Sequence, residues 1–143
     1  MRTDQSLTSA TLGDGGIYSS VEDLAKWDAA LGDDRLLRPA SLRLAFQPST
    51  ETDDSRVQYG FGWFITDEAR WHSGESLGFR NVILRHLERR LTVIVLTNRN
   101  DPSPYPMALK IARLFLPDAA APAADAAAGA HGAGPDSAAW PLP

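Results

Sequence analysis

The residues best suited to catalysis by their types and spacing lie in the short run from Trp71 to Phe79. This run reads Trp-His-Ser-Gly-Glu-Ser-Leu-Gly-Phe. His72 can carry a positive charge, Ser73 supplies a hydroxyl, and Gly74 allows a close approach to the backbone. An acyl-transfer site needs such groups on the wall opposite its nucleophile. The run therefore predicts one wall of an active site at the end of a strand, and no nucleophile suited to face it is evident elsewhere in the chain.

Other chemistries find little support. The chain has no cysteine, which excludes disulfides and thiolate metal sites. His72, His86 and His131 lack metal-ligand spacing, so neither a metal nor a cofactor is expected, and His86 is interpreted as a strand residue facing solvent or a neighbour. The glycine-rich residues 13–16 precede a helix but lack the Lys-Ser/Thr of a phosphate-binding loop.

Length and composition indicate one domain with an irregular tail. The chain has 143 residues and a net charge of −4, and its basic residues are scattered except for Arg85, Arg89 and Arg90 around a turn. These arginines are interpreted as solubilising charges, and no nucleic-acid partner is expected. Residues 117–143 consist mainly of Ala, Pro, Gly and Asp, which predicts disorder, with a partly helical stretch at 123–128 as the alternative. Residues 1–11 are taken as an N-terminal extension, leaving 12–116 as the folded part.

Two helices are expected first. In residues 19–22 the Ser19 hydroxyl and the Glu22 carboxylate can form a capping box, and Gly32 ends the helix. A second, short helix should begin at Pro39 and end near Phe46. The apolar residues of the first helix recur at helical spacing: Val21, Leu24, Trp27 and Leu31.

Strands and a final helix follow. Aromatic residues alternate with glycines over residues 59–66, which predicts a strand in which Gly60 and Gly62 allow close packing. Strands are also expected at 70–72 and 78–87, and the nearly continuous apolar run 91–97 suggests a central strand buried on both faces. The last helix should span residues 105–116, with one apolar face made of Met107, Ile111, Leu114 and Phe115. The predicted fold class is α+β, an antiparallel sheet of about four strands with helices packed on it.

Five segments, in unbroken order, resemble the C-terminal part of the serine β-lactamase-related family, which includes class C β-lactamases, D-alanyl-D-alanine carboxypeptidases and related esterases. The segments are residues 13–27, 36–42, 59–63, 72–74 together with 78–80, and 91–98. The resemblance covers residues 12–116. It implies a partial β-lactamase/transpeptidase-like fold and a serine hydrolase that acts on a lactam, a D-Ala peptide or an ester.

The same resemblance implies roles for the wall. His72 would assist proton transfer and anion binding, and Ser73 would hydrogen-bond the substrate beside Gly74. The backbone N–H of Glu75 would be one of two donors to the oxyanion. Glu75 stands where many relatives have glycine, and its carboxylate is expected either to pair with His72 or to point to solvent. A carboxylate there would disfavour an acidic substrate.

The family's first motif is missing from these residues. No Ser-x-x-Lys occurs, because the residues three positions before Lys26 and Lys110 are Asp23 and Met107. Tyr18 imitates a Tyr-x-Ser triplet, but its segment is structural in the family. The chain is therefore expected to be inactive alone, either as a C-terminal fragment or as half of a split enzyme. The alternative is a non-catalytic interaction domain that kept the sheet.

Partners and location follow from the same features. A small-molecule substrate is expected only if an N-terminal segment completes the site. In the family fold an N-terminal strand pair lies beside the strand at 91–97. Without that pair, this strand should be an exposed apolar edge that promotes self-association. The chain has no apolar run long enough to span a membrane and no signal peptide, so it is expected to be cytoplasmic as written, although full-length relatives are often periplasmic or secreted.

Overall fold

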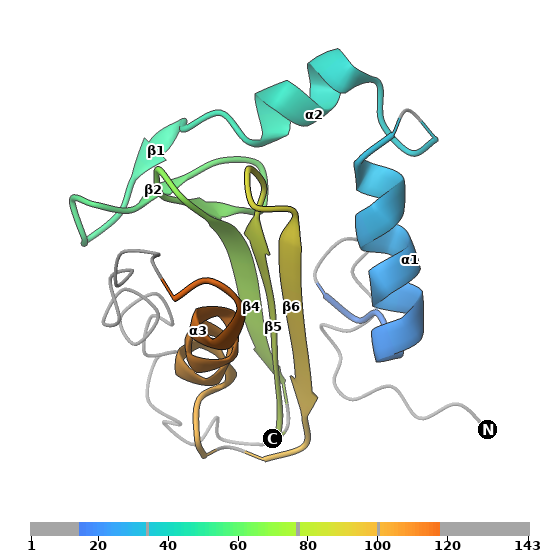
Figure 1. Ribbon diagram of the computed structural model, residues 1–143, viewed down its shortest axis with the longest axis vertical. Coiled ribbons are helices and arrows are strands. Elements are labelled where there is room, and N and C mark those ends of the chain that lie inside the picture. The colour runs from blue at the N-terminus through green and yellow to red at the C-terminus, as the bar shows by residue number, and fades with distance from the viewer. Residues whose placement is uncertain (1–14, 34, 77, 100, 118–143) are drawn as a thin grey trace, which may run out of the picture.

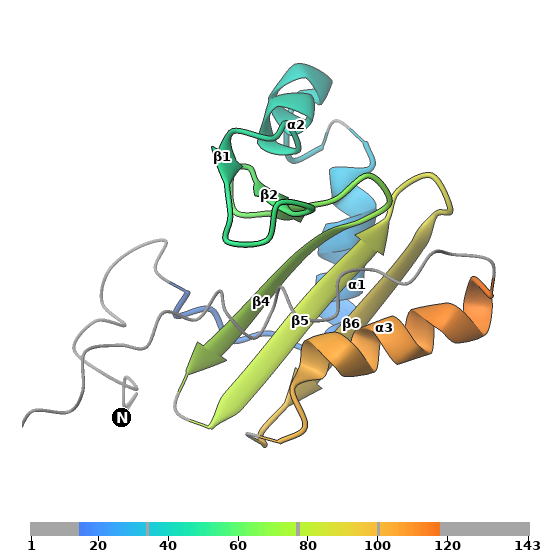
Figure 2. The same ribbon diagram turned by 90° about the vertical axis from the view of Figure 1, so that its left-hand side faces the viewer.

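The computed structural model describes residues 15–33, 35–76, 78–99 and 101–117. Its elements form one antiparallel sheet in the order β1-β2-β3-β4-β5-β6, with α3 on one face and α1 on the other (Figures 1 and 2). The α+β class is confirmed, with six strands rather than about four. The elements are α1 (Val21–Leu31), α2 (Pro39–Ala45), β1 (Thr50–Glu51), β2 (Gln58–Tyr59), β3 (Phe64–Ile65), β4 (Arg70–Ser76), β5 (Phe79–His86), β6 (Leu91–Thr97) and α3 (Pro104–Phe115). The predicted N-terminal extension and almost all of the predicted tail lie outside the described residues.

The single strand predicted over residues 59–66 is wrong. Strands β2 and β3 pair with each other across a tight turn, in which the Gly60 N–H donates to the Trp63 carbonyl at 2.8 Å. Gly62 has φ +78°, in the left-handed region that favours glycine. Gly60 packs closely, as predicted, because a Cβ there would lie 2.5 Å from the Ala45 carbonyl oxygen. The aromatic–glycine alternation therefore encodes a hairpin.

Helix α1 begins one residue later than the predicted capping box. The Asp23 N–H donates to Ser20 Oγ at 3.1 Å, so the cap is Ser20 and not Ser19. The backbone of Ser20 is extended, as an N-cap requires, with φ −111° and ψ 165°. Gly32 ends the helix as predicted.

The main core lies between the sheet and α3. The indole of Trp71 is 1% exposed and stacks on the ring of Tyr105 at 5.0 Å between ring centroids. Cross-strand register places Leu84 beside Trp71 and Val93 beside Leu84. The core also contains Val57, Ala69, Val82, Ala108, Leu109 and Ala112. This core holds β4 in place on the face of the sheet that α3 covers.

Helix α3 buries a different face from the one predicted. Leu114 and Phe115 are 80% and 66% exposed, whereas Ala108 and Ala112 are buried against the sheet. Small side chains allow the helix to approach the strands closely, which the bulkier face would prevent. The outer face of α3 therefore presents an apolar stripe.

A smaller core occupies the opposite face, where α1 packs near β6 (Figure 1). The Asp28 carboxylate on α1 lies 2.5 Å from Arg85 Nε on β5 and accepts a 2.9 Å hydrogen bond from Thr92 Oγ1 on β6. Arg85 is buried beneath α1, so its interpretation as a solubilising charge is wrong, although Arg89 and Arg90 are exposed. A buried cation requires such a partner.

Strand β6 is an edge strand rather than a central one. It ends the strand order, and among the described residues only β5 pairs with it. Val93 is its one buried side chain, and the other six are partly exposed. The apolar run thus reflects coverage by α3 and α1 on its two faces, not a central place in this sheet.

Candidate active site

The run singled out in the sequence lies on β4. Side chains alternate between the two faces of a strand, and Trp71 points into the core beneath α3. His72 and Gly74 therefore face the side of α1, while Ser73 and Glu75 face the side of α3. The structure brings the predicted residues onto one strand but divides their side chains between its two faces. What the four residues share is the backbone edge of β4.

An aromatic series supports His72. Its imidazole stacks on the Phe64 ring at 6.4 Å between centroids, with an interplanar angle of 23°. Phe64 also stacks on Trp71 at 5.4 Å, and Trp71 stacks on Tyr105. Burial raises the pKa of the Tyr105 phenol well above its ordinary value of 10.0, with a smaller contribution from Asp54. Tyr105 therefore stays neutral and acts as support rather than as a proton-transfer group.

The backbone of β4 presents donors at its outer edge, defined as residues 72–76 on the side away from β5. The Thr66 N–H donates to the Ala69 carbonyl at 3.0 Å, which fixes the hydrogen-bonding phase of the β3–β4 hairpin. Because antiparallel ladders alternate, the N–H groups of Ser73 and Glu75 point away from β5. Strand β3 pairs with β4 only as far as Trp71, so within the described residues no strand takes up these donors.

Gly74 lies beside open space. A Cβ built at this position would meet no atom within 4 Å, and its φ is not in the left-handed region. Neither packing nor backbone conformation among the described residues requires a glycine here. Strand alternation directs a Cβ at position 74 to the same face of β4 as the Cβ of His72.

Glu75 forms an ion pair that the sequence did not predict. Arg80 Nη2 lies 2.9 Å from both carboxylate oxygens, and the two residues are direct cross-strand partners. The Glu75 carboxylate therefore has Arg80 as a partner, an interaction that was not among the two expected ones. The signal that could have identified the pair is the opposite charge five residues along a hairpin.

Tyr18 lies exposed in the segment that leads into α1. Its side chain is 62% exposed and precedes α1, which packs against β6. His72 lies on β4, and β5 separates β4 from β6.

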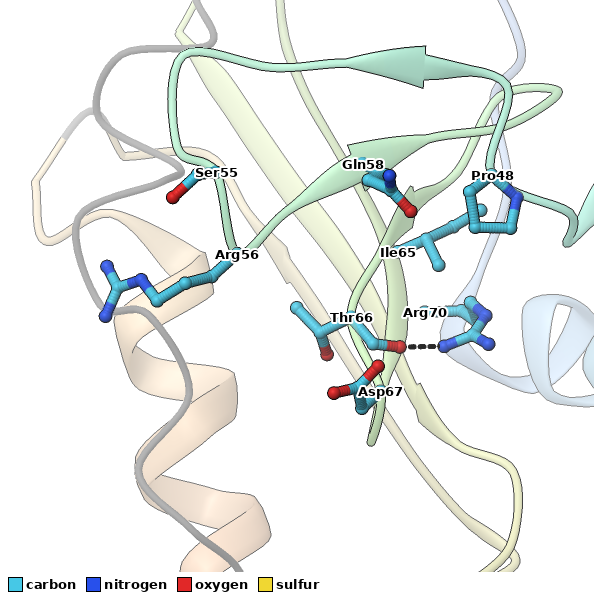
Figure 3. A pocket seen from close by; sticks show the side chains of 8 residues that line it. All are labelled: Pro48, Ser55, Arg56, Gln58, Ile65, Thr66, Asp67 and Arg70. Atoms are coloured by element: carbon cyan, nitrogen blue, oxygen red, sulfur yellow. Dashed lines mark hydrogen bonds between the residues drawn. The ribbon is translucent and has the colours of Figure 1, made fainter.

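A polar pocket of about 310 Å³ lies at the β2–β3 end of the sheet, and no sequence motif predicted it (Figure 3). Arg70 donates to the Thr66 carbonyl, and Arg56 pairs with Asp54 at 2.7 Å. None of the four predicted site residues lines the pocket. Its lining comprises Pro48, Ser55, Arg56, Gln58, Ile65, Thr66, Asp67 and Arg70.

The part of the chain that the structure describes contains neither a cluster of metal-binding side chains nor a membrane-spanning helix. No three His, Asp or Glu side chains gather closely enough to hold a metal ion. None of the three helices has the length and apolar character needed to cross a membrane.

Comparison with known proteins identifies the class of this fold. The β-lactamase family model matches residues 2–118, so the chain belongs to the β-lactamase family of serine hydrolase-related proteins. It is 31% identical over 102 residues to penicillin-binding protein 4* of Bacillus subtilis (strain 168). That alignment covers 68% of this chain and 23% of the relative, so the chain matches about a quarter of the relative's length. No solved structure matches significantly.

Proposed function

We propose that this chain forms the C-terminal wall of a serine acyl-transfer hydrolase acting on a lactam, a D-Ala peptide or an ester. The observation that carries the proposal is the outer edge of β4, where the Glu75 N–H points away from the sheet and Gly74 borders open space. An N–H group held in this way can stabilise the oxyanion of a tetrahedral intermediate.

The remaining groups have separate roles in this proposal. His72, on the open face, assists proton transfer and attracts an anionic substrate. Ser73 hydrogen-bonds the substrate at the edge of the strand. The nucleophile comes from a segment outside these residues that carries Ser-x-x-Lys, so the chain is inactive alone. The relative's name states that it binds penicillin, which makes a β-lactam the first ligand to test.

The test combines the chain with a nucleophile-bearing segment, either fused or co-expressed. The isolated chain should neither hydrolyse nitrocefin or p-nitrophenyl acetate nor become labelled by a fluorescent penicillin, and the combination should do both. In the active combination, Glu75→Pro should lower kcat by about 10²–10³ because it removes one oxyanion donor. Glu75→Gln keeps the N–H and serves as the matched control. Labelling of any serine in the isolated chain by a fluorophosphonate would contradict the proposal.

A second function is supported by a different observation. No strand among the described residues pairs with the outer edge of β6, and Met107, Leu114 and Phe115 are exposed on α3. Such a surface suits a non-catalytic interaction domain or self-association through Leu91–Thr97. Sedimentation of the isolated chain decides this point: a concentration-independent monomer with a cooperative thermal transition would contradict self-association.

A further inference from the structure

Arg80 is the charged residue most directly connected to the proposed oxyanion donor. It lies opposite Glu75 on β5, and its Nη2 contacts both carboxylate oxygens at 2.9 Å. The pair is partly shielded, with side-chain exposures of 29% for Arg80 and 37% for Glu75. Arg80 Nε is buried and has no hydrogen-bond partner among the described residues, so the Nη2 contact with Glu75 is the hydrogen bond that orients this guanidinium.

The carboxylate of Glu75 is only a few bonds away from the backbone N–H of the same residue. An unpaired negative charge there would oppose the negative charge that develops on an acyl oxygen bound to this N–H. The ion pair cancels that charge. It also joins the ends of β4 and β5 where the hairpin turns, beside Ser76 and Phe79.

We propose that Arg80 is a positioning residue that holds the Glu75 N–H at the outer edge of β4 and cancels the Glu75 carboxylate, so that this edge accepts an oxyanion and a carboxylate-bearing acyl substrate. The proposal rests on the proposed function for its catalytic meaning. It answers the objection that a glutamate at this position disfavours acidic substrates.

Amide hydrogen exchange of the full chain, followed by NMR, measures both effects without catalytic activity. Hydroxide-catalysed exchange removes the amide proton and passes through an anion, so its rate reports the local electrostatic potential. A unit charge about 5 Å away alters such a rate by about fourfold in a water-like dielectric. The wild-type Glu75 N–H should exchange readily because no strand among the described residues pairs with it. The Gly74 N–H, which points toward Asn81 on β5, should be protected and reports local opening.

Charge variants then separate electrostatics from loosening. Arg80→Gln should slow Glu75 exchange about fourfold, because it leaves a bare carboxylate, and Glu75→Gln should accelerate exchange at position 75 by a similar factor. The double variant and Arg80→Lys should stay near the wild-type rate. Loosening alone would accelerate exchange in every variant, together with exchange at Gly74.

The outcomes divide clearly. Opposite signs for the two single variants support the proposal, and equal or uniformly faster rates overturn it. If Arg80→Gln does not fold, Glu75→Gln with unchanged exchange at Gly74 supports the proposal, and equal acceleration at both amides overturns it. A Glu75 N–H that is strongly protected in the wild-type chain overturns the geometry. If the exchange pattern holds but the completed enzyme is inactive, the proposed function fails while the positioning role of Arg80 stands.

Discussion

Two glycines on the same chain should respond in opposite ways to the same added methyl group. At Gly60 a Cβ would lie 2.5 Å from the Ala45 carbonyl oxygen and 2.9 Å from Ile65 Cδ1. A backbone carbonyl at the end of α2 cannot move aside as a flexible side chain could. At Gly74 a Cβ would meet no atom within 4 Å. We therefore predict that Gly60→Ala destabilises the fold strongly and that Gly74→Ala does not.

The magnitudes follow from packing and chain entropy. Overpacking costs typically 1–3 kcal/mol, and the Gly60 contacts place that variant at about 3 kcal/mol. A glycine inside a strand is less favourable than alanine by roughly 0.5–1 kcal/mol, so Gly74→Ala should raise the free energy of unfolding by about 0.5 kcal/mol. Since domains are stable by about 5–15 kcal/mol, only the Gly60 change removes a large share.

Urea unfolding followed by the fluorescence of the buried Trp63 and Trp71 measures both variants. With a slope of about 1–1.5 kcal/mol/M, the midpoint of Gly60→Ala should fall by roughly 2–3 M, and that of Gly74→Ala should stay within about 0.5 M of the wild type. In the completed enzyme, Gly74→Ala should nevertheless impair acylation, because the methyl group fills the open space beside His72. Equal destabilisation of the two variants would refute the reasoning, since Gly74 would then be a structural glycine.

The remaining predictions concern buried charge, pH and the sheet edge. Asp28→Ala should lower the free energy of unfolding by about 3 kcal/mol because it leaves Arg85 buried without its partner. Adding Arg85→Met should recover much of the loss. A double variant no more stable than Asp28→Ala in calorimetry would contradict this. Burial lowers the pKa of His86 from 6.5, against an opposing effect of Glu68, so the unfolded chain binds the proton first. The free energy of unfolding should therefore be highest above about pH 6.5 and decline below it. In urea titrations at several pH values, His86→Gln should reduce the dependence of this free energy on pH. Leu96→Pro should abolish self-association with the fold retained, because ladder alternation points the Leu96 N–H outward from β6. Val95→Pro should unfold the chain, because the Val95 N–H points toward β5. In sedimentation and circular dichroism, unfolding by Leu96→Pro but not by Val95→Pro would refute this hydrogen-bonding phase.

Much of the fold was accessible from the sequence because its longest elements are locally consistent. The strand at 91–97 and the helices at 21–31 and 104–115 have periodic apolar residues and clear ends. The errors arose where tertiary packing decided between two local solutions. Helix α3 has two apolar faces, and only the sheet selects the one with Ala108 and Ala112.

The candidate site was predictable in composition but not in geometry. His72 to Glu75 form a recognisable run, but the strand expected at residues 70–72 extends to Ser76 in the structure and so carries all four residues. The Glu75–Arg80 pair was missed because it depends on the register of β4 against β5. The polar pocket was missed because its residues come from separate loops and share no local pattern. The roles of the four site residues remain predictions.

The outer edge of β4 is ordered by its own sheet before any partner arrives. Fixing a backbone costs about 1–2 kcal/mol per residue, so the five residues of this edge represent roughly 5–10 kcal/mol of conformational entropy that is already lost on folding. A nucleophile-bearing segment that docks here does not have to supply that ordering, which favours tight and rapid assembly. Under the proposed function this edge is a fixed template, and different segments can be matched to it without rebuilding the strand.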